Sequence, residues 1–366
     1  MTLRDHIGQL FMLGFTGTSV SRQLEVYLSD LRPAGVILFS RNLENAAQMV
    51  DLTNRLQKLV GPDPMLIAID QEGGRVSRLP QGFTIFPPCE VFGRCNSYEM
   101  TYAAAAVTAA ELRAVGINMN MAPVLDVNTN PDNPIIGDRA FSQDPEQVAA
   151  LGLAIIRGLQ DLRVVACGKH FPGHGDTSQD SHLELPGVSA SCERLEAVEL
   201  PPFARAVTHG VASLMTAHVV YPALDPHHPA TLSRAILTDL LRRRFGFDGL
   251  VLTDDLEMRA IADHGGVEDA AVRALQAGAD MLLICKEPAQ QVAAMEAVLK
   301  AVEADEIDRA QIEMSLARIK RTKQRFLLPY VPADISAARL IVGSRSHRVL
   351  LDKILDSRER RRHVSV

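Results

Sequence analysis

The sequence lacks several features that would point to particular classes of protein. It contains no tryptophan, and only 5% of its 366 residues are aromatic. Long polysaccharide clefts usually present aromatic side chains on which successive sugars stack, so an extended cleft of that kind is not expected. No apolar run approaches the roughly 20 residues that a membrane-spanning helix needs. We therefore expect a protein that is not embedded in a membrane and that binds a small ligand.

Positive charge and paired cysteines are also scarce. Lysine and arginine number 38 against 44 aspartate and glutamate, a formal net charge of −6, which gives no electrostatic support for binding nucleic acid. The five cysteines are odd in number and scattered, and none has the spacing of a zinc site. The first residues contain no continuous apolar segment of the kind found in secretory signals. These observations favour the reducing cytoplasm and a protein without a metal or other cofactor.

Short apolar segments recur along the chain, separated by longer segments with helical periodicity. Segments rich in Val, Ile, Leu and Met favour strands that are buried on both faces. Eight such strands are expected at 10–15, 35–39, 65–69, 117–124, 164–167, 213–217, 249–252 and 280–284. Eight β-then-α units favour a single (β/α)8 barrel with some irregular strands, and a doubly wound sheet is the alternative.

The barrel is expected to occupy residues 1–330. Residues 331–366 are too few for a second domain that contains a sheet, so we expect a short helical extension there. The basic run 358–362 at its end is expected to be a solvated tail.

Ionisable residues gather directly after the predicted strands. Asp70 follows the third, Lys169 and His170 follow the fifth, His218 follows the sixth, and Asp254 follows the seventh. Because the carboxyl ends of the strands of such a barrel meet on one face, these side chains are predicted to converge there. The strand starts, by contrast, are apolar or glycine. This asymmetry favours an enzyme over a structural protein.

The densest polar segment spans residues 169–182. It holds three His, two Asp and one Lys around two Gly and one Pro, which predicts a loop rather than a helix. In an extended segment, residues i and i+2 point the same way, so Asp180 can hydrogen-bond one imidazole nitrogen of His182. The other nitrogen is then available to donate and accept protons near neutral pH.

Asp254 follows the apolar segment 249–252 after a single residue, Thr253. A short carboxylate at the end of a rigid strand is held in a fixed position, which suits a nucleophile. The alternative is that Asp254 or Asp255 caps the helix that follows. Asp255 is the better candidate for such a structural role.

With these residues in place, the chain resembles the family 3 glycoside hydrolases, and among them the single-domain bacterial β-N-acetylglucosaminidases. Five segments carry the resemblance in family order across most of residues 1–320: Asp70 to Val76, Asn133 to Phe141, Lys169 to Gly175, Asp180 to His182, and Asp254 to Met258. Small departures are Ser77, Thr253 and Glu257, where the family commonly has glutamine, serine and serine.

The resemblance implies a retaining β-hexosaminidase with an unusual pair of catalytic groups. Asp254 matches the nucleophile, and Asp180 with His182 matches the acid/base pair. In the family, four residues bind hydroxyl groups of the terminal sugar, and the residues of this chain that match them are Asp70, Arg139, Lys169 and His170. Arg75, Met119 and His218 are expected to line or support the pocket.

The resemblance also implies a substrate, N-acetylglucosamine β-linked to anhydro-N-acetylmuramic acid, which is released during cell-wall recycling. The few aromatics favour an exo-acting enzyme on small glycosides, and a monomer or weak homo-oligomer is expected. Four alternatives stay open: a β-glucosidase or a phosphorylase of the same family, a non-catalytic sugar-binding module, and a zinc hydrolase. The zinc ligands would be drawn from His170, His174, Asp176, His182 and Asp254.

Overall fold

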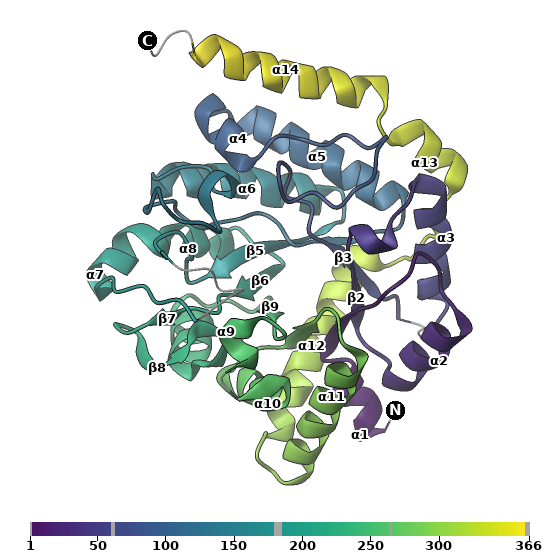
Figure 1. Ribbon diagram of the computed structural model, residues 1–366, viewed down its shortest axis with the longest axis vertical. Helices are drawn as coiled ribbons and strands as arrows, with labels where there is room; N and C mark the ends of the chain where they lie inside the picture. The colour runs from purple at the N-terminus through teal and green to yellow at the C-terminus, as the bar shows by residue number, and fades with distance from the viewer. Residues whose placement is uncertain (1, 60–62, 179–184, 264, 363–366) are drawn as a thin grey trace.

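The computed structural model describes residues 2–59, 63–178, 185–263 and 265–362. Its centre is a closed barrel of parallel strands (Figure 1). In order around the barrel, the strands are β1 (Phe11–Gly14), β10 (Met281–Ile284), β9 (Leu250–Asp255), β6 (Ser213–Thr216), β5 (Val165–Phe171), β4 (Met119–Asn120), β3 (Leu66–Ile69) and β2 (Gly35–Leu38). The predicted eight-stranded barrel is confirmed, and the doubly wound alternative is wrong.

Helices surround the barrel (Figure 1). They are α1 (Leu3–Gly8), α2 (Arg22–Leu31), α3 (Ala46–Gln57), α4 (Cys89–Cys95), α5 (Tyr98–Ala114), α6 (Pro145–Asp161), α7 (Cys192–Arg194), α8 (Pro201–Thr208), α9 (Arg259–Ala262), α10 (Gly266–Ala277), α11 (Pro288–Glu303), α12 (Arg309–Leu327), α13 (Ile335–Ile341) and α14 (Arg345–Arg362). The layer around β6 is completed by two π-helical segments and a hairpin. The π-helical segments are η3 (Leu195–Glu199) and η5 (Ala235–Arg244), and the hairpin consists of β7 (Val220–Tyr221) and β8 (Asp225–Pro229). Among the described residues, none of the helices is both long and apolar enough to cross a bilayer.

The apolar composition of the strands explains the barrel. Every residue of β1, β2, β3, β6 and β10 is buried, because one face of each strand packs inside the barrel and the other packs against helices. Cys167 and Cys285 are both buried. The barrel therefore provides a rigid base for the groups at its carboxyl ends.

Three strands differ from their predicted bounds by more than one residue at an end. β5 continues through Lys169 and His170 to Phe171, and β9 continues through Asp254 and Asp255. Their polar side chains find buried partners, so the strand does not need to end where its apolar run ends. β4 is short because the chain soon reaches Pro123, whose nitrogen cannot donate to a ladder.

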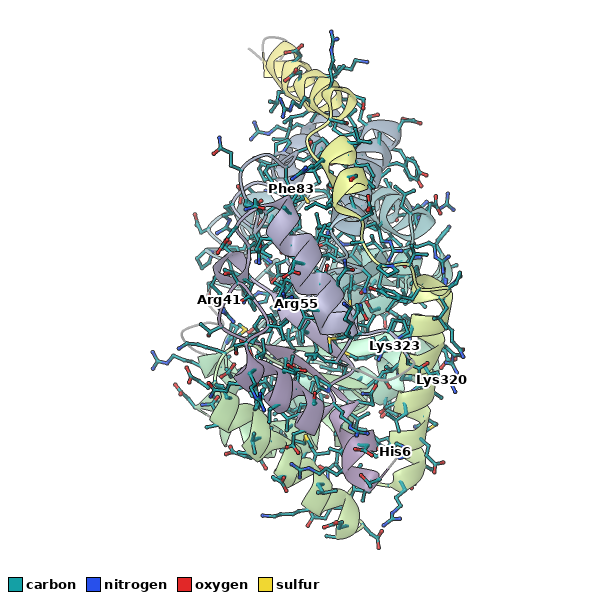
Figure 2. All side chains as sticks on the ribbon, turned by 90° about the vertical axis from the view of Figure 1, so that its right-hand side faces the viewer. His6, Arg41, Arg55, Phe83, Lys320 and Lys323 are labelled. Carbon is teal, nitrogen blue, oxygen red and sulfur yellow. The ribbon has the colours of Figure 1, made fainter. Side chains whose placement is uncertain are left out.

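The C-terminal extension packs on one side of the barrel. In Figure 1, α14 (yellow) lies across α4 and α5, and in Figure 2, α13 runs beside α3, which carries Arg55. The basic run 358–362 forms the end of α14, and the expectation that its side chains are solvated stays a prediction. We propose that residues 1–330 form the catalytic barrel and that 331–366 belong to it as an extension.

One buried carboxylate joins this extension to the barrel. Glu111 of α5 accepts hydrogen bonds from the backbone nitrogen of Thr84 at 2.8 Å and from its hydroxyl at 2.7 Å. It also accepts from the backbone nitrogen of Gly343 at 2.9 Å and from Nδ1 of His347 at 2.7 Å. Gly343 has a positive φ, and a side-chain carbon there would collide with the carbonyl oxygen of Gly82.

We expect Glu111→Ala to lower the free energy of unfolding by about 3 kcal/mol, because it leaves several buried donors without an acceptor. Urea unfolding measures the change, and limited proteolysis reports whether residues 331–366 become susceptible. Glu99→Ala, on the exposed face of the same helix, is the control and should change stability by less than about 1 kcal/mol. Equal effects of the two variants would contradict a joining role for Glu111.

Candidate active site

A cavity of about 290 Å³ opens at the carboxyl ends of the strands. Apolar side chains from β2, β6 and β10 form part of its wall, and charged side chains form the rest. The polar lining residues are Asp70, Glu72, Arg75, Arg78, Arg139, Lys169, His170, His174, Asp254 and Asp255. Most of the residues selected from the sequence thus converge on one face of the barrel, as predicted.

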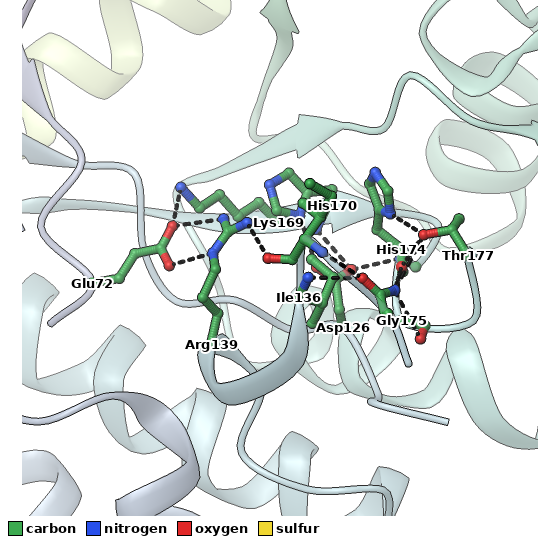
Figure 3. A network of polar contacts seen from close by, with 12 residues as sticks. Glu72, Asp126, Ile136, Arg139, Lys169, His170, His174, Gly175 and Thr177 are labelled. Atoms are coloured by element: carbon green, nitrogen blue, oxygen red, sulfur yellow. Dashed lines mark hydrogen bonds and ion pairs between the residues drawn. The ribbon is translucent and has the colours of Figure 1, made fainter. Parts of the chain in front are cut away.

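A buried carboxylate, Glu72, lies between two cations (Figure 3). Its oxygens accept from Nζ of Lys169 at 2.6 Å and from two guanidinium nitrogens of Arg139 at 2.8 and 2.9 Å. Lys169 also donates to Oδ1 of Asp70 at 2.8 Å. Arg139 reaches this position from η2 (Gly137–Arg139), a turn after β4.

The charges of this group stabilise one another. Burial alone would raise the pKa of Glu72, but the adjacent charges of Lys169 and Arg139 hold it well below its ordinary value. Burial alone would lower the pKa of Lys169, but Asp70 and Glu72 raise it. Glu72 and Lys169 therefore stay ionised. Among the described residues, Oδ2 of Asp70 has no partner and can accept from a ligand hydroxyl.

A second buried carboxylate, Asp126, holds the other half of the site (Figure 3). Its Oδ2 lies 2.7 Å from Nδ1 of His170, and its Oδ1 accepts from the backbone nitrogens of His170 at 3.0 Å and His174 at 2.7 Å. Burial would raise the pKa of Asp126, but His170 and the other hydrogen bonds lower it. Burial, together with the charge of His170, lowers the pKa of His174 to about 4, so that imidazole is neutral at pH 7.

The segment after His170 is fixed by buried polar groups. Nδ2 of Asn133 donates to the carbonyl oxygens of His174 at 2.9 Å and Gly175 at 3.1 Å. The hydroxyl of Tyr221 donates to the carbonyl oxygen of Gly173 at 2.6 Å. The Cα of Gly175 packs so closely on the Val127 carbonyl that no side chain would fit there. Asp180 and His182, the predicted acid/base pair, lie outside the described residues.

Asp254 and Asp255 stand side by side at the end of β9 but differ in charge. Oδ1 of Asp254 accepts from the backbone nitrogen of Asp255 at 2.8 Å. Burial would raise the pKa of Asp254, but the charges of His218 and His170 lower it, so the carboxylate is ionised. Burial, aided by the charges of Glu257 and Asp254, raises the pKa of Asp255 to about 7.

The remaining predicted residues lie at the edge of the cavity or behind it. Arg75 lines the outer edge, where Nε donates to Asp138 at 2.9 Å. His218 is buried behind the site, with Nε2 3.0 Å from the carbonyl oxygen of Asp255. Met119 is buried in β4, in register with Ala68 of β3, and is not among the residues that line the cavity.

Sequence reasoning did not select Glu72, Arg78 or Asp126 as site residues. Arg78 lines the cavity, and its buried Nε has no partner among the described residues, so it can donate to a ligand. A signal existed for Glu72, because it falls in the segment from Asp70 to Val76, and Arg78 lies two residues beyond that segment. Asp126 gave only a weak signal, an acidic residue after an apolar segment.

Metal binding was one of the alternatives. Within the part of the chain that the structure describes, no group of three or more His, Cys, Asp or Glu side chains is arranged to hold an ion. His182, one of the ligands considered, lies outside that part.

Comparison with known proteins agrees with this geometry. The family model described as "Glycosyl hydrolase family 3 N terminal domain" matches residues 2–322. A beta-hexosaminidase of Nitrosomonas eutropha is 43% identical over 283 residues, which cover 76% of this chain and 80% of the relative. A similar protein from Thiobacillus denitrificans is 41% identical over 76% of this chain and 78% of its own length.

Two solved structures show the same arrangement of the chain. A glycoside hydrolase family 3 β-N-acetylglucosaminidase from Paenibacillus sp. str. FPU-7 has a TM-score of 0.94 and 42% identity over 98% of this chain and 69% of that chain. NagZ from Neisseria gonorrhoeae, in complex with N-trifluoroacetyl-D-glucosamine, has a TM-score of 0.77 and 31% identity over 95% of this chain and 98% of that one.

The raised pKa of Asp255 has a consequence for stability. Its ordinary value is 3.8 and its value in the fold is about 7, so between these pH values the folded protein holds a proton that the unfolded chain has lost. The free energy of unfolding should therefore fall as the pH rises from about 4 to about 7. Because the side chain is partly exposed, we expect a fall on the order of 2 kcal/mol.

This fall should be absent from Asp255→Asn, which cannot ionise. Urea unfolding of both proteins at several pH values between 4 and 8 measures the difference. Parallel pH profiles for the wild type and the variant would show that the folded protein does not retain a proton on Asp255.

Proposed function

This chain belongs to glycosyl hydrolase family 3, and we propose that it is a retaining exo-β-N-acetylglucosaminidase that works through a covalent glycosyl-enzyme. The observation that carries the proposal is the position of Asp254, an ionised carboxylate fixed at the end of a barrel strand and facing a cavity lined by hydroxyl-binding groups. The relatives named beta-hexosaminidase support the same activity.

The terminal sugar would be held by the charged groups on the β3 and β5 side of the cavity. Asp70 accepts from hydroxyl groups, whereas Lys169, Arg139 and Arg78 donate to them. Glu72 fixes both Lys169 and Arg139 and neutralises part of their charge. These side chains are already in place without a ligand, so binding requires little reorganisation.

Asp254 then acts as the nucleophile. Oδ1 is held by the backbone nitrogen of Asp255, which leaves Oδ2 to attack the anomeric carbon. As the glycosidic bond breaks, its electrons go to the leaving oxygen, which takes a proton from His182. His182, oriented by Asp180, next removes a proton from water, and the resulting attack on the glycosyl-enzyme releases the sugar with retained configuration.

The size of the cavity favours a single terminal sugar. Its volume of about 290 Å³ lies at the lower end of the range of ligand pockets, about 300–1,000 Å³. The complex of the Neisseria gonorrhoeae NagZ with N-trifluoroacetyl-D-glucosamine supports an N-acetylated sugar. We propose small muropeptide fragments as substrates, in cytoplasmic recycling of the cell wall, on the resemblance noted in the sequence.

We expect Asp254→Ala to reduce the hydrolysis of a chromogenic N-acetyl-β-glucosaminide at least about 10⁴-fold, because no covalent intermediate can form. The matching β-glucoside, assayed beside it, tests the sugar, and the wild type should prefer the N-acetylated compound. Added azide should attack in place of the missing carboxylate and give an α-glycosyl azide.

Asp263→Ala, an exposed aspartate close to α9, is the control and should keep wild-type activity. Substantial turnover by Asp254→Ala would contradict its role as the nucleophile. A wild type that prefers the glucoside would keep the mechanism but overturn the proposed sugar.

The acid role of His182 predicts a dependence on the leaving group. His182→Ala should lose about 10²–10⁴-fold in rate on an N-acetylglucosaminide with a poor, alcohol-like leaving group, which needs a proton. It should lose much less on a nitrophenyl glycoside, whose leaving group departs without one. Steady-state rates on the two substrates measure the ratio, and equal losses on both would count against general acid catalysis by this residue.

A further inference from the structure

We propose that Asp126 is a positioning residue that fixes the proton of His170 on Nδ1 and so determines which group the imidazole presents to the sugar. The proposal deepens the function proposed above and rests on it where substrate is concerned. The position of the proton can be tested in the free protein, without any substrate.

The contacts of Asp126 divide between its two oxygens. Oδ1 accepts from two backbone nitrogens, those of His170 at 3.0 Å and His174 at 2.7 Å. Oδ2 lies 2.7 Å from Nδ1 of His170. The side chain is completely buried, so no solvent competes for either oxygen.

An ionised carboxylate accepts hydrogen bonds and cannot donate them. The lowered pKa of Asp126 means that it is ionised at neutral pH, so Nδ1 of His170 must carry the proton in the contact between them. The ring lines the cavity, and Nε2 has no partner among the residues that the structure describes. Nε2 therefore faces the ligand as an acceptor when the ring is neutral and as a charged donor when it is protonated.

The neighbouring imidazole of His174 has a different group at its Nδ1. Its Nδ1 lies 2.8 Å from the hydroxyl of Thr177, a group that can either donate or accept. The ring of His174 touches that of His170, with the centroids 5.7 Å apart. The Nδ1 atoms of two adjacent imidazoles thus have different partners, a carboxylate for His170 and a hydroxyl for His174.

A purely structural role would need only Oδ1. The two backbone nitrogens it binds hold the turn between His170 and His174, and an asparagine could hold them equally well with its carbonyl oxygen. The same asparagine would turn its NH₂ group toward Nδ1 of His170, which would then have to accept. The proton would move to Nε2. Asp126→Asn therefore keeps the shape of the side chain and both backbone contacts, but it moves the imidazole proton from one ring nitrogen to the other.

The first experiment is NMR of the full-length free protein labelled with ¹⁵N-histidine. Long-range ¹H–¹⁵N spectra distinguish the two neutral forms of an imidazole, and the His170→Ala spectrum identifies the signals of His170. We expect Nδ1 to carry the proton in the wild type and Nε2 to carry it in Asp126→Asn. Proton on the same nitrogen in both proteins would overturn the proposal, whatever the activity of the enzyme.

The second experiment measures the kinetic consequence with the chromogenic N-acetyl-β-glucosaminide. We expect Asp126→Asn to lower kcat/KM about 10–100-fold, by analogy with the loss found when the carboxylate partner of a metal-ligating histidine is replaced. In the His170→Ala background the same change should have little further effect, since Asp126 acts through His170. If the losses in kcat/KM from the two substitutions multiplied in the double variant, Asp126 would act independently of His170, and the proposal would be overturned.

Glu199→Gln is a matched control, the same exchange of carboxylate for amide at a buried acid that packs on Gly173. Its carboxylate contacts Arg194 rather than an imidazole, so kcat/KM should stay within about twofold and the His170 spectrum should not change. An equal loss in Glu199→Gln would assign the effect to packing of the segment and overturn the proposal. If the wild type cleaves no N-acetylglucosaminide, the proposed function fails, whereas the NMR result still decides the role of Asp126.

Discussion

The need to neutralise buried charge at the carboxyl ends of the strands governs this site. Lys169 is almost fully buried in β5, where an isolated ammonium ion would be costly, and Glu72 and Asp70 make its burial possible. Glu72 also binds Arg139, so one carboxylate ties together β3, β5 and the turn after β4. Removing one partner would leave another charge buried alone, which is costly. The arrangement is therefore rigid before any ligand arrives.

The carboxylates of the site differ in charge although they lie close together. Neighbouring imidazoles keep Asp254 ionised, as its proposed role requires, whereas the same burial next to other carboxylates raises the pKa of Asp255 to about 7. Asp126 is ionised because it accepts three hydrogen bonds. The roles therefore follow from local partners and not from residue type, since all three are aspartates in the same half of the barrel.

The barrel could be predicted from the sequence because each strand is a short apolar segment. The position of Asp254 at the cavity could be predicted because it comes soon after one of these segments. The sequence was insufficient where a residue acts through partners distant along the chain. Glu72 has a function only beside Lys169 and Arg139, and Asp126 only beside His170. Polarity also misplaced the end of β5, because a polar residue can remain in a buried strand when the fold supplies its counter-charge.

Sugar binding and proton transfer are physically connected in this arrangement. The oxygen of Asp126 that holds the backbone of His170 also holds that of His174, where the segment leading toward Asp180 and His182 begins. Asn133 fixes the next carbonyl groups of that segment. A displacement of His170 by a poorly fitting sugar would therefore be transmitted to the start of the segment that carries the proposed acid/base pair. Discrimination between sugars should then appear in kcat as well as in KM, because the group that recognises the substrate and the backbone that leads to the proton donor share one carboxylate.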